Sequence, residues 1–278
     1  MPNRRKTQQI ASLLCCIFII SPALVHAEDL YPLRTRSGLV DNEPYSIGLD
    51  LGVVSNEALP FSTTVPSVRD KAHLPNIRLI APMGARAVFR AEWPVLRVSD
   101  IDFPTARDAT ITAGDPWLEM EGMLIRNGWG HFDVSALLGA KIPSAREKIA
   151  AGTNQVDMLL EIAASRPLIN TRIHLNLGLH IADVPDYAVG KTGNPATNSQ
   201  DDTLRYGLAI TAPWGDRTLM LEYHGNAMSR FNNNFAYVRG GIRNPLSDDW
   251  LLTGSMALGT TKESGEIEAN FGLTRYFR

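Results

Sequence analysis

Apolar and polar residues alternate one by one along several stretches of this chain. In 173–181, isoleucine and leucine at the odd positions alternate with His174, Asn176, Gly178 and His180. Successive side chains of a β-strand point to opposite faces, whereas a helix would scatter these apolar residues around its axis. The pattern therefore predicts strands with one apolar and one polar face. The same alternation recurs in 45–53, 132–142 and 266–274.

About twelve segments of this kind follow one another, and many have the length of a tilted strand that crosses a bilayer, about ten residues. A sheet in lipid must close on itself, because an open edge would leave backbone N–H and C=O groups unpaired. We therefore predict an all-β fold, a transmembrane antiparallel up-and-down β-barrel of about 12 strands. The expected strands are 45–54, 75–82, 85–94, 116–126, 129–142, 153–166, 171–182, 203–213, 217–227, 234–244, 249–259 and 265–278.

Short and long connections alternate between these segments. The short ones include Pro82-Met83-Gly84, Asn127-Gly128, 168–170 and 214–216, and Asn-Gly predicts a tight two-residue hairpin. Periplasmic turns and extracellular loops of outer-membrane barrels differ in length in this way. The pattern predicts both ends of the barrel in the periplasm. The expected long loops are 55–74, 95–115, 143–152, 183–202, 228–233 and 260–264.

Most charged residues of the segments share the polar face. The exceptions are Arg126, Arg166, Arg217 and Arg275, which fall at segment ends beside short connections. A basic side chain facing lipid costs about 2–4 kcal/mol at mid-bilayer but only about 0–1 kcal/mol near the interface. The alternative, a secreted soluble barrel with an apolar interior, would have to pack about fifty large side chains into one lumen, more than a small closed barrel holds.

The N-terminal residues 1–27 read as a signal peptide. Three basic residues precede an apolar run over 10–20, and Val25-His26-Ala27 forms a small-residue cleavage site. The alternative is an uncleaved helical anchor. Cleavage would remove both cysteines and three of the 27 basic residues, leaving 24 against 29 acidic residues and a net charge of −5 instead of −2. The mature chain would therefore have no disulfide, and its acidic balance argues against nucleic-acid binding.

The expected organisation is thus a signal peptide over 1–27, a periplasmic lead-in over 28–44 and the barrel over 45–278. This organisation predicts the cell outer membrane of a Gram-negative bacterium as the location. We expect outer-membrane lipid, lipopolysaccharide and the barrel-assembly machinery as partners, and a monomer. No cofactor is expected.

In their order along the chain, Lys141-Ile142-Pro143, Asn176-Leu177-Gly178 and Tyr276-Phe277-Arg278 resemble motifs of outer-membrane barrels of the phenol meta-pathway degradation, transporter-like family. Lys141-Ile142-Pro143 matches a strand end of that family, and Asn176-Leu177-Gly178 matches its Asn-X-Gly strand. Tyr276-Phe277-Arg278 resembles the terminal aromatic signature of such barrels, although the aromatic residue usually comes last. The resemblance implies passage of small, hydrophobic or aromatic, molecules. Its sequence stretches are 75–99, 113–121, 136–145, 150–168 and 173–181.

The polar face holds the candidate functional residues. His174 and His180 are six residues apart on one strand, roughly 20 Å, so they cannot share a metal ion. No metal, cofactor or catalytic residue is predicted. The expected lumen-lining residues are Glu121, Asp157, Arg172, His174, Arg205, Glu222, His224 and Arg239.

Three functions remain open at this stage. Inward charges of both signs could line a narrow channel for a small solute, or could pair across the lumen and plug it. A non-transporting barrel could stabilise the membrane or bind a surface partner through its loops. Tyr223-His224-Gly225-Asn226 faintly resembles the His-X-Ser-Asn stretch of outer-membrane lipid deacylases, but Asn226 stands in the serine position and Ser229 is five residues from His224.

Overall fold

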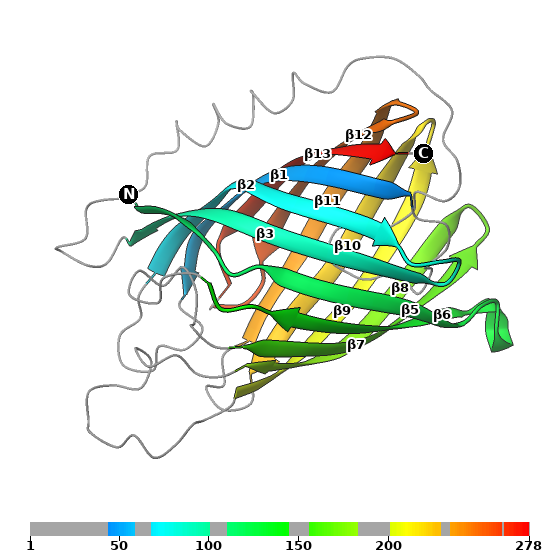
Figure 1. Cartoon of the computed structure of the whole chain (residues 1–278), viewed down its shortest axis with the longest axis horizontal. Coiled ribbons are helices and arrows are strands. Elements are labelled where there is room, and N and C mark those ends of the chain that lie inside the picture. The colour runs from blue at the N-terminus through cyan, green and yellow to red at the C-terminus, as the bar shows by residue number, and fades with distance from the viewer. Residues whose placement is uncertain are drawn as a thin grey trace.

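A computed structural model describes residues 44–58, 68–100, 110–144, 156–182, 201–228, 234–262 and 264–277. Thirteen strands form one antiparallel sheet (Figure 1). The strands are β1 Tyr45–Ala58, β2 Val68–Pro82, β3 Ala87–Asp100, β4 Thr110–Ala113, β5 Trp117–Ile125, β6 Asp133–Lys141, β7 Asp157–Leu168, β8 Thr171–Ala182, β9 Asp201–Trp214, β10 Arg217–Met228, β11 Asn234–Ser247, β12 Trp250–Gly259 and β13 Ile267–Phe277.

The sheet closes into a barrel because β1 pairs with both β2 and β13. The β1–β13 seam runs from Tyr45↔Phe277 to Ser55↔Ile267, and β13 lies beside β1 in Figure 1. The sheet order follows the chain order, as in an up-and-down barrel. The described part of the chain contains no helix of the length and hydrophobicity needed to cross a membrane.

Two short strands share one position in the wall. Both β4 and β5 pair with β3, β4 along 95–98 and β5 along 87–92. Gly114-Asp115-Pro116 separates them, and Pro116 has no N–H to donate to a sheet. Thirteen strands therefore make a twelve-position wall, which confirms the predicted transmembrane-type β-barrel of 12 strands.

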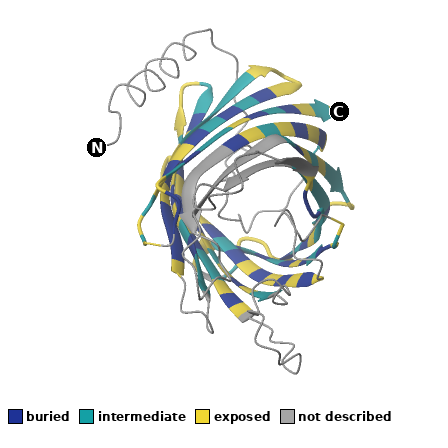
Figure 2. Cartoon of the chain, turned by 90° about the vertical axis from the view of Figure 1, so that its left-hand side faces the viewer, coloured by how far each residue is buried: buried dark blue, intermediate teal, exposed yellow. Residues whose placement is uncertain are grey.

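The outer face of the wall is apolar and the inner face is polar, the reverse of a soluble β-barrel. In β8, Leu175, Leu177 and Leu179 are exposed on the outside, while His174 and Gly178 are buried inside. Buried and exposed residues alternate along each strand in Figure 2. The predicted polarity of the faces is confirmed, since this chain exposes leucine and isoleucine and buries serine, threonine and charged groups.

One predicted turn is wrong. Asn127-Gly128 does not make a two-residue hairpin, because Trp129–His131 add a short 3-10 helix, η1, before β6 begins at Asp133. Asn127 has a left-handed φ of 47°, and its backbone N–H donates to the Asp133 carboxylate at 2.8 Å. β6 therefore starts at Asp133, later than the expected strand over 129–142.

Strands extend beyond their predicted limits at the long-loop end. β1 and β2 extend into the expected loop 55–74, and β3 and β4 extend into the expected loop 95–115. These extensions pair with one another through irregular registers, with bulges on β2 that break the sequence alternation. Sequence alternation alone therefore predicts strands that are too short at this end. Most of the other expected long loops fall outside the described residues, as do the signal peptide and the lead-in up to residue 43.

The exposed apolar face predicts a depth-dependent response to charge. We expect Leu177→Arg, at the middle of β8, to lower the free energy of unfolding by about 2–4 kcal/mol in lipid vesicles, because the guanidinium would face acyl chains. Ile181→Arg, near the end of the same outward row, should cost about 0–1 kcal/mol. Denaturant unfolding of the refolded barrel measures both. Equal costs would contradict a lipid-facing β8.

Candidate functional site

The lumen wall carries the polar residues that the strands bury. This set contains hydroxyl groups, carboxylates and two basic residues, and it is spread over nearly every strand. Burial of such groups is costly unless each finds a partner. Its members are Ser46, Asn76, Asp115, Glu121, Asp133, Ser135, Lys141, Asp157, Glu161, Ser165, His174, Thr203, Thr211, Thr218, Glu222, Arg239, Thr253, Ser255, Ser264, Glu268 and Thr274.

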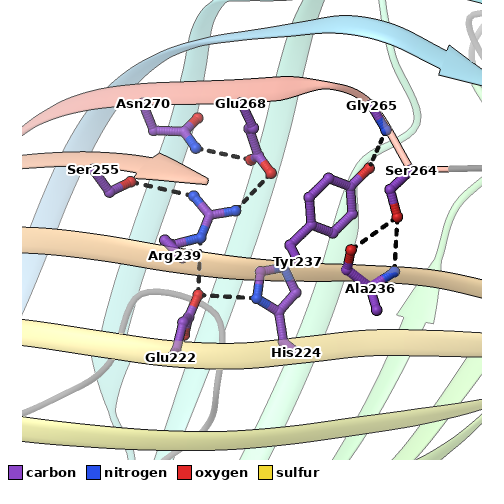
Figure 3. Close-up of polar contacts among 10 residues, drawn as sticks. All are labelled: Glu222, His224, Ala236, Tyr237, Arg239, Ser255, Ser264, Gly265, Glu268 and Asn270. Atoms are coloured by element: carbon purple, nitrogen blue, oxygen red, sulfur yellow. Dashed lines mark hydrogen bonds and ion pairs between the residues drawn. The ribbon is translucent and has the colours of Figure 1, made fainter. Parts of the chain in front are cut away.

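Arg239 is the centre of the largest group of contacts (Figure 3). Its side chain is only 1% exposed, and its Nε lies 2.9 Å from Oε1 of Glu222. Its Nη2 donates to Oε2 of Glu268 at 2.6 Å, and its Nη1 donates to Oγ of Ser255 at 3.2 Å. One guanidinium thus contacts two carboxylates and a hydroxyl, and Asn270 donates to the second oxygen of Glu268 at 2.8 Å.

Sheet register explains how Arg239 reaches both carboxylates. Glu222 on β10 is its direct neighbour, whereas Glu268 on β13 is two strands away. Ala257 on β12 stands between them, paired with Arg239 on one side and with Glu268 on the other. Because alanine has a single methyl group, the long arginine side chain can extend over it. A larger residue at this position would block the Arg239–Glu268 contact.

His224 extends the same group toward the long-loop end of β10. Its Nδ1 lies 3.2 Å from Oε1 of Glu222, and its ring stacks on Tyr237 with the ring centroids 5.5 Å apart. The Tyr237 hydroxyl accepts a hydrogen bond from the Gly265 backbone N–H at 3.0 Å. The imidazole is therefore held between a carboxylate and a ring. Ser229, five residues after His224 in the expected loop 228–233, lies outside the described residues.

A second group lies where β6 and β7 approach the long-loop end. Nζ of Lys141 is 2.5 Å from Oδ2 of Asp157 and 3.9 Å from Oδ2 of Asp115. His180 Nε2 lies 3.3 Å from the same Asp157 oxygen, and its ring lies 5.5 Å from that of Trp117. Lys141 thus joins carboxylates from two parts of the wall.

Two further ion pairs line the β3–β8 side. Arg90 Nη1 lies 2.5 Å from Glu121, whose other carboxylate oxygen accepts a hydrogen bond from Ser135 at 2.5 Å. Arg172 Nη1 donates to Asp133 at 3.0 Å and to Ser165 Oγ at 3.0 Å. The Ser135 hydroxyl thus binds the carboxylate of the first pair, whereas the Ser165 hydroxyl binds the guanidinium of the second.

A glycine has the same role at the barrel seam that Ala257 has elsewhere. Arg78 on β2 lies 3.5 Å from Asp50 and reaches over β1 to Thr274 on β13, at 3.4 Å. Gly48 stands between Arg78 and Thr274 in the register. A Cβ at Gly48 would lie 3.1 Å from the Arg78 guanidinium, so even an alanine would require the arginine side chain to shift by a few tenths of an ångström.

The predicted lumen residues separate into different groups. Glu222, His224 and Arg239 come together, whereas Glu121, Asp157 and Arg172 each belong to another ion pair. His174 is fully buried, and its Nε2 lies 3.0 Å from the Thr211 hydroxyl. Arg205 is half-buried on the inner face of β9. His174 and His180 have separate partners, Thr211 and Asp157.

Sequence reasoning did not single out several partners in these groups. The alternation places Glu268, Asp133 and Lys141 on the polar face together with Ser135 and Ser255, but nothing in the sequence separates them from the other polar positions. The available signal was parity, since every one of them occupies the polar face of its strand. Parity does not reveal which members of that face touch, because this depends on the register between strands.

These groups can hold charge close to a polar lumen without leaving it uncompensated. Each ion pair described above joins strands that are adjacent or two apart in the sheet. The charged groups are therefore held along the wall. This arrangement suits a surface that presents fixed charges and hydroxyl groups to a passing solute.

No protein-family model matches this chain, and a search of curated proteins finds no match. Among solved structures, the COG4313 outer membrane channel from Pseudomonas putida F1 superposes with a TM-score of 0.63 at 13% identity, covering 91% of this chain and 100% of that one. The NanC porin gives a TM-score of 0.54 at 8% identity, and the KdgM porin 0.53 at 7%, each covering 84% of this chain and 99% of the other. At these identities, the likeness shows the outer-membrane barrel fold.

The Arg239 group makes a testable prediction about stability. We expect Arg239→Met to lower the free energy of unfolding by about 3–5 kcal/mol, because it leaves two buried carboxylates without their shared cation. Adding Glu222→Gln and Glu268→Gln should restore most of the loss by removing both negative charges. Denaturant unfolding in detergent micelles compares the variants. If the triple variant were no more stable than Arg239→Met, the carboxylates would not be the cause of the loss.

Proposed function

We propose that this chain is an outer-membrane channel through which small solutes diffuse along a polar wall. The observation that supports the proposal is that the ion pairs run along the barrel wall between nearby strands. Arg239, Lys141, Arg90, Arg172 and Arg78 each bind carboxylates on neighbouring strands or on strands two apart. The sequence is compatible with a charge-lined passage and with a plug made by ion pairs across the lumen. Pairing along the wall favours the charge-lined passage.

The fold supports the same function. The exposed apolar exterior fits lipid, and the closed seam removes the sheet edges that lipid would not tolerate. The solved structures of similar fold include an outer membrane channel and two porins. An outer-membrane location follows from this function.

The chemistry of the wall suggests the class of solute. The inward side chains that keep partial exposure, such as Arg78 at 33%, Asp50 at 23% and Arg172 at 17%, are charged, and such groups favour small polar or charged solutes that exchange water for wall contacts. The hydrophobic or aromatic solutes implied by the family resemblance remain a prediction. Single-channel conductance in a planar lipid bilayer, measured with each class of solute as a blocker, distinguishes polar or charged solutes from hydrophobic or aromatic ones.

Arg172 is the most informative residue for this proposal. Its side chain is 17% exposed, whereas that of Arg239 is 1% exposed, so the Arg172 charge reaches further toward water. We expect Arg172→Gln to raise the cation-to-anion permeability ratio by about two- to fivefold, because it removes a positive charge from the wall and leaves Asp133. Planar lipid bilayer recordings of the refolded mature protein measure the ratio.

A matched control separates a lumen effect from a general change in the barrel. Leu204→Val changes an exposed outward residue of β9 and should leave the ratio at the wild-type value. An unchanged ratio in Arg172→Gln would contradict a lumen that conducts past this residue. A folded wild-type barrel without unitary current steps would contradict the channel and favour the non-transporting, surface-binding alternative.

A further inference from the structure

Three outward-facing arginines of the barrel lie over aromatic rings. The Arg166 guanidinium carbon is 5.5 Å from the ring centre of Phe132, and that of Arg217 is 5.6 Å from Trp214. The carbon of Arg275 is 5.6 Å from Trp250 and 5.2 Å from Phe277. We call Arg166, Arg217 and Arg275 with these four rings the arginine belt.

The belt lies at one end of the barrel. Arg166 is two residues from the end of β7, Arg217 is the first residue of β10, and Arg275 is two residues from the end of β13. All three positions adjoin the short turns, the right-hand end of the wall in Figure 1. Their strands are three positions apart in the sheet, so the belt extends over about half of the circumference. The sequence-based prediction of rim positions for these arginines is confirmed.

The belt arginines lack the anionic partners that the lumen arginines have. Within the described parts of the chain, no carboxylate lies within ion-pair distance of Arg166, Arg217 or Arg275, whereas Arg78, Arg90, Arg172 and Arg239 each have one. Arg217 donates from Nε to the Asn244 side-chain oxygen at 2.9 Å, which leaves its terminal nitrogens for another acceptor. A ring covers one face of a guanidinium but leaves its in-plane N–H groups available.

The aromatic rings place these N–H groups at the border of the apolar exterior. Trp214 is 58% exposed and Phe277 is 41% exposed, and both point outward from strand ends. Exposed aromatic rings at strand ends mark the level of lipid head groups in outer-membrane barrels. Near the middle of the wall, level with Leu177, the outward rings of Tyr206 and Tyr223 instead lie against each other, with centroids 6.0 Å apart. The arginine–aromatic contacts of the belt thus lie beside the short turns, whereas the contact at mid-wall joins two tyrosines.

We propose that the arginine belt binds the phosphodiester head groups of phospholipids in the leaflet at the short-turn end. A planar guanidinium with several N–H donors matches phosphate oxygens, and the adjoining rings would contact the glycerol and upper acyl region of the same lipid. A free phosphate ion would use only the guanidinium. The exposed rings are what favour a lipid as the ligand.

Native mass spectrometry of the whole mature barrel, released from detergent, tests this proposal. The probes are phosphatidylglycerol and a diacylglycerol with the same chains, which lacks the phosphate. Wild-type protein should retain phosphatidylglycerol at least about fivefold more than diacylglycerol. Arg166→Gln, Arg217→Gln and Arg275→Gln should each weaken retention at its own position about fivefold, since one basic residue near a charged lipid surface contributes about that factor, and the combined variant should weaken total retention more than any single one.

Three controls make each outcome decisive. Lys262→Gln removes an exposed cation at the opposite end and should retain lipid as wild type does. Heat-dependent gel mobility confirms folding, and the single variants replace the combined one if it does not fold. Inorganic phosphate should displace no more lipid than sodium chloride of equal ionic strength. Wild-type retention by the arginine variants, equal retention of diacylglycerol, or specific displacement by inorganic phosphate would each overturn the proposal.

Discussion

The pairing of every backbone N–H and C=O in the sheet is the constraint on which this structure depends. In lipid, an unpaired group has no water to bind, so β1 must find β13 and close the wall. Closure in turn leaves only two surfaces, an exterior against acyl chains and an interior around the lumen. The alternation of Leu175, Leu177 and Leu179 with His174 and Gly178 then assigns each side chain to one of them.

An interior lined with polar groups creates the second requirement, that each buried charge meets a partner. The chain meets it with side chains that reach along the wall, and small residues open the way for the longest reaches. Ala257 allows Arg239 to contact Glu268, and Gly48 allows Arg78 to contact Thr274. Isolated buried charges would be strongly destabilising, whereas these shared contacts compensate both signs. The pairs that stabilise the wall are also those that give the lumen its electrostatic character.

The same residue type has a different partner on each face of the barrel. Inward arginines such as Arg172 meet carboxylates, while outward arginines such as Arg217 meet aromatic rings at the rim. An acidic partner on the outer face would itself have to be removed from water by lipid, whereas a ring is compatible with the apolar exterior. This difference connects the two proposals, because the inner surface is suited to a solute and the outer one to lipid head groups.

The sequence by itself determined the barrel, the number of wall positions and the face of the residues in the regular strands, including the inward orientation of Arg239, Glu222 and His224. These properties follow from alternation with a period of two and from connection lengths, which are local. Only the tertiary structure decided the 3-10 turn at Trp129–His131 and the pairing of Arg239 with Glu268, which is 29 residues away. Contacts of this kind depend on strand register and on how far a side chain can reach over its neighbour, and no single segment contains that information.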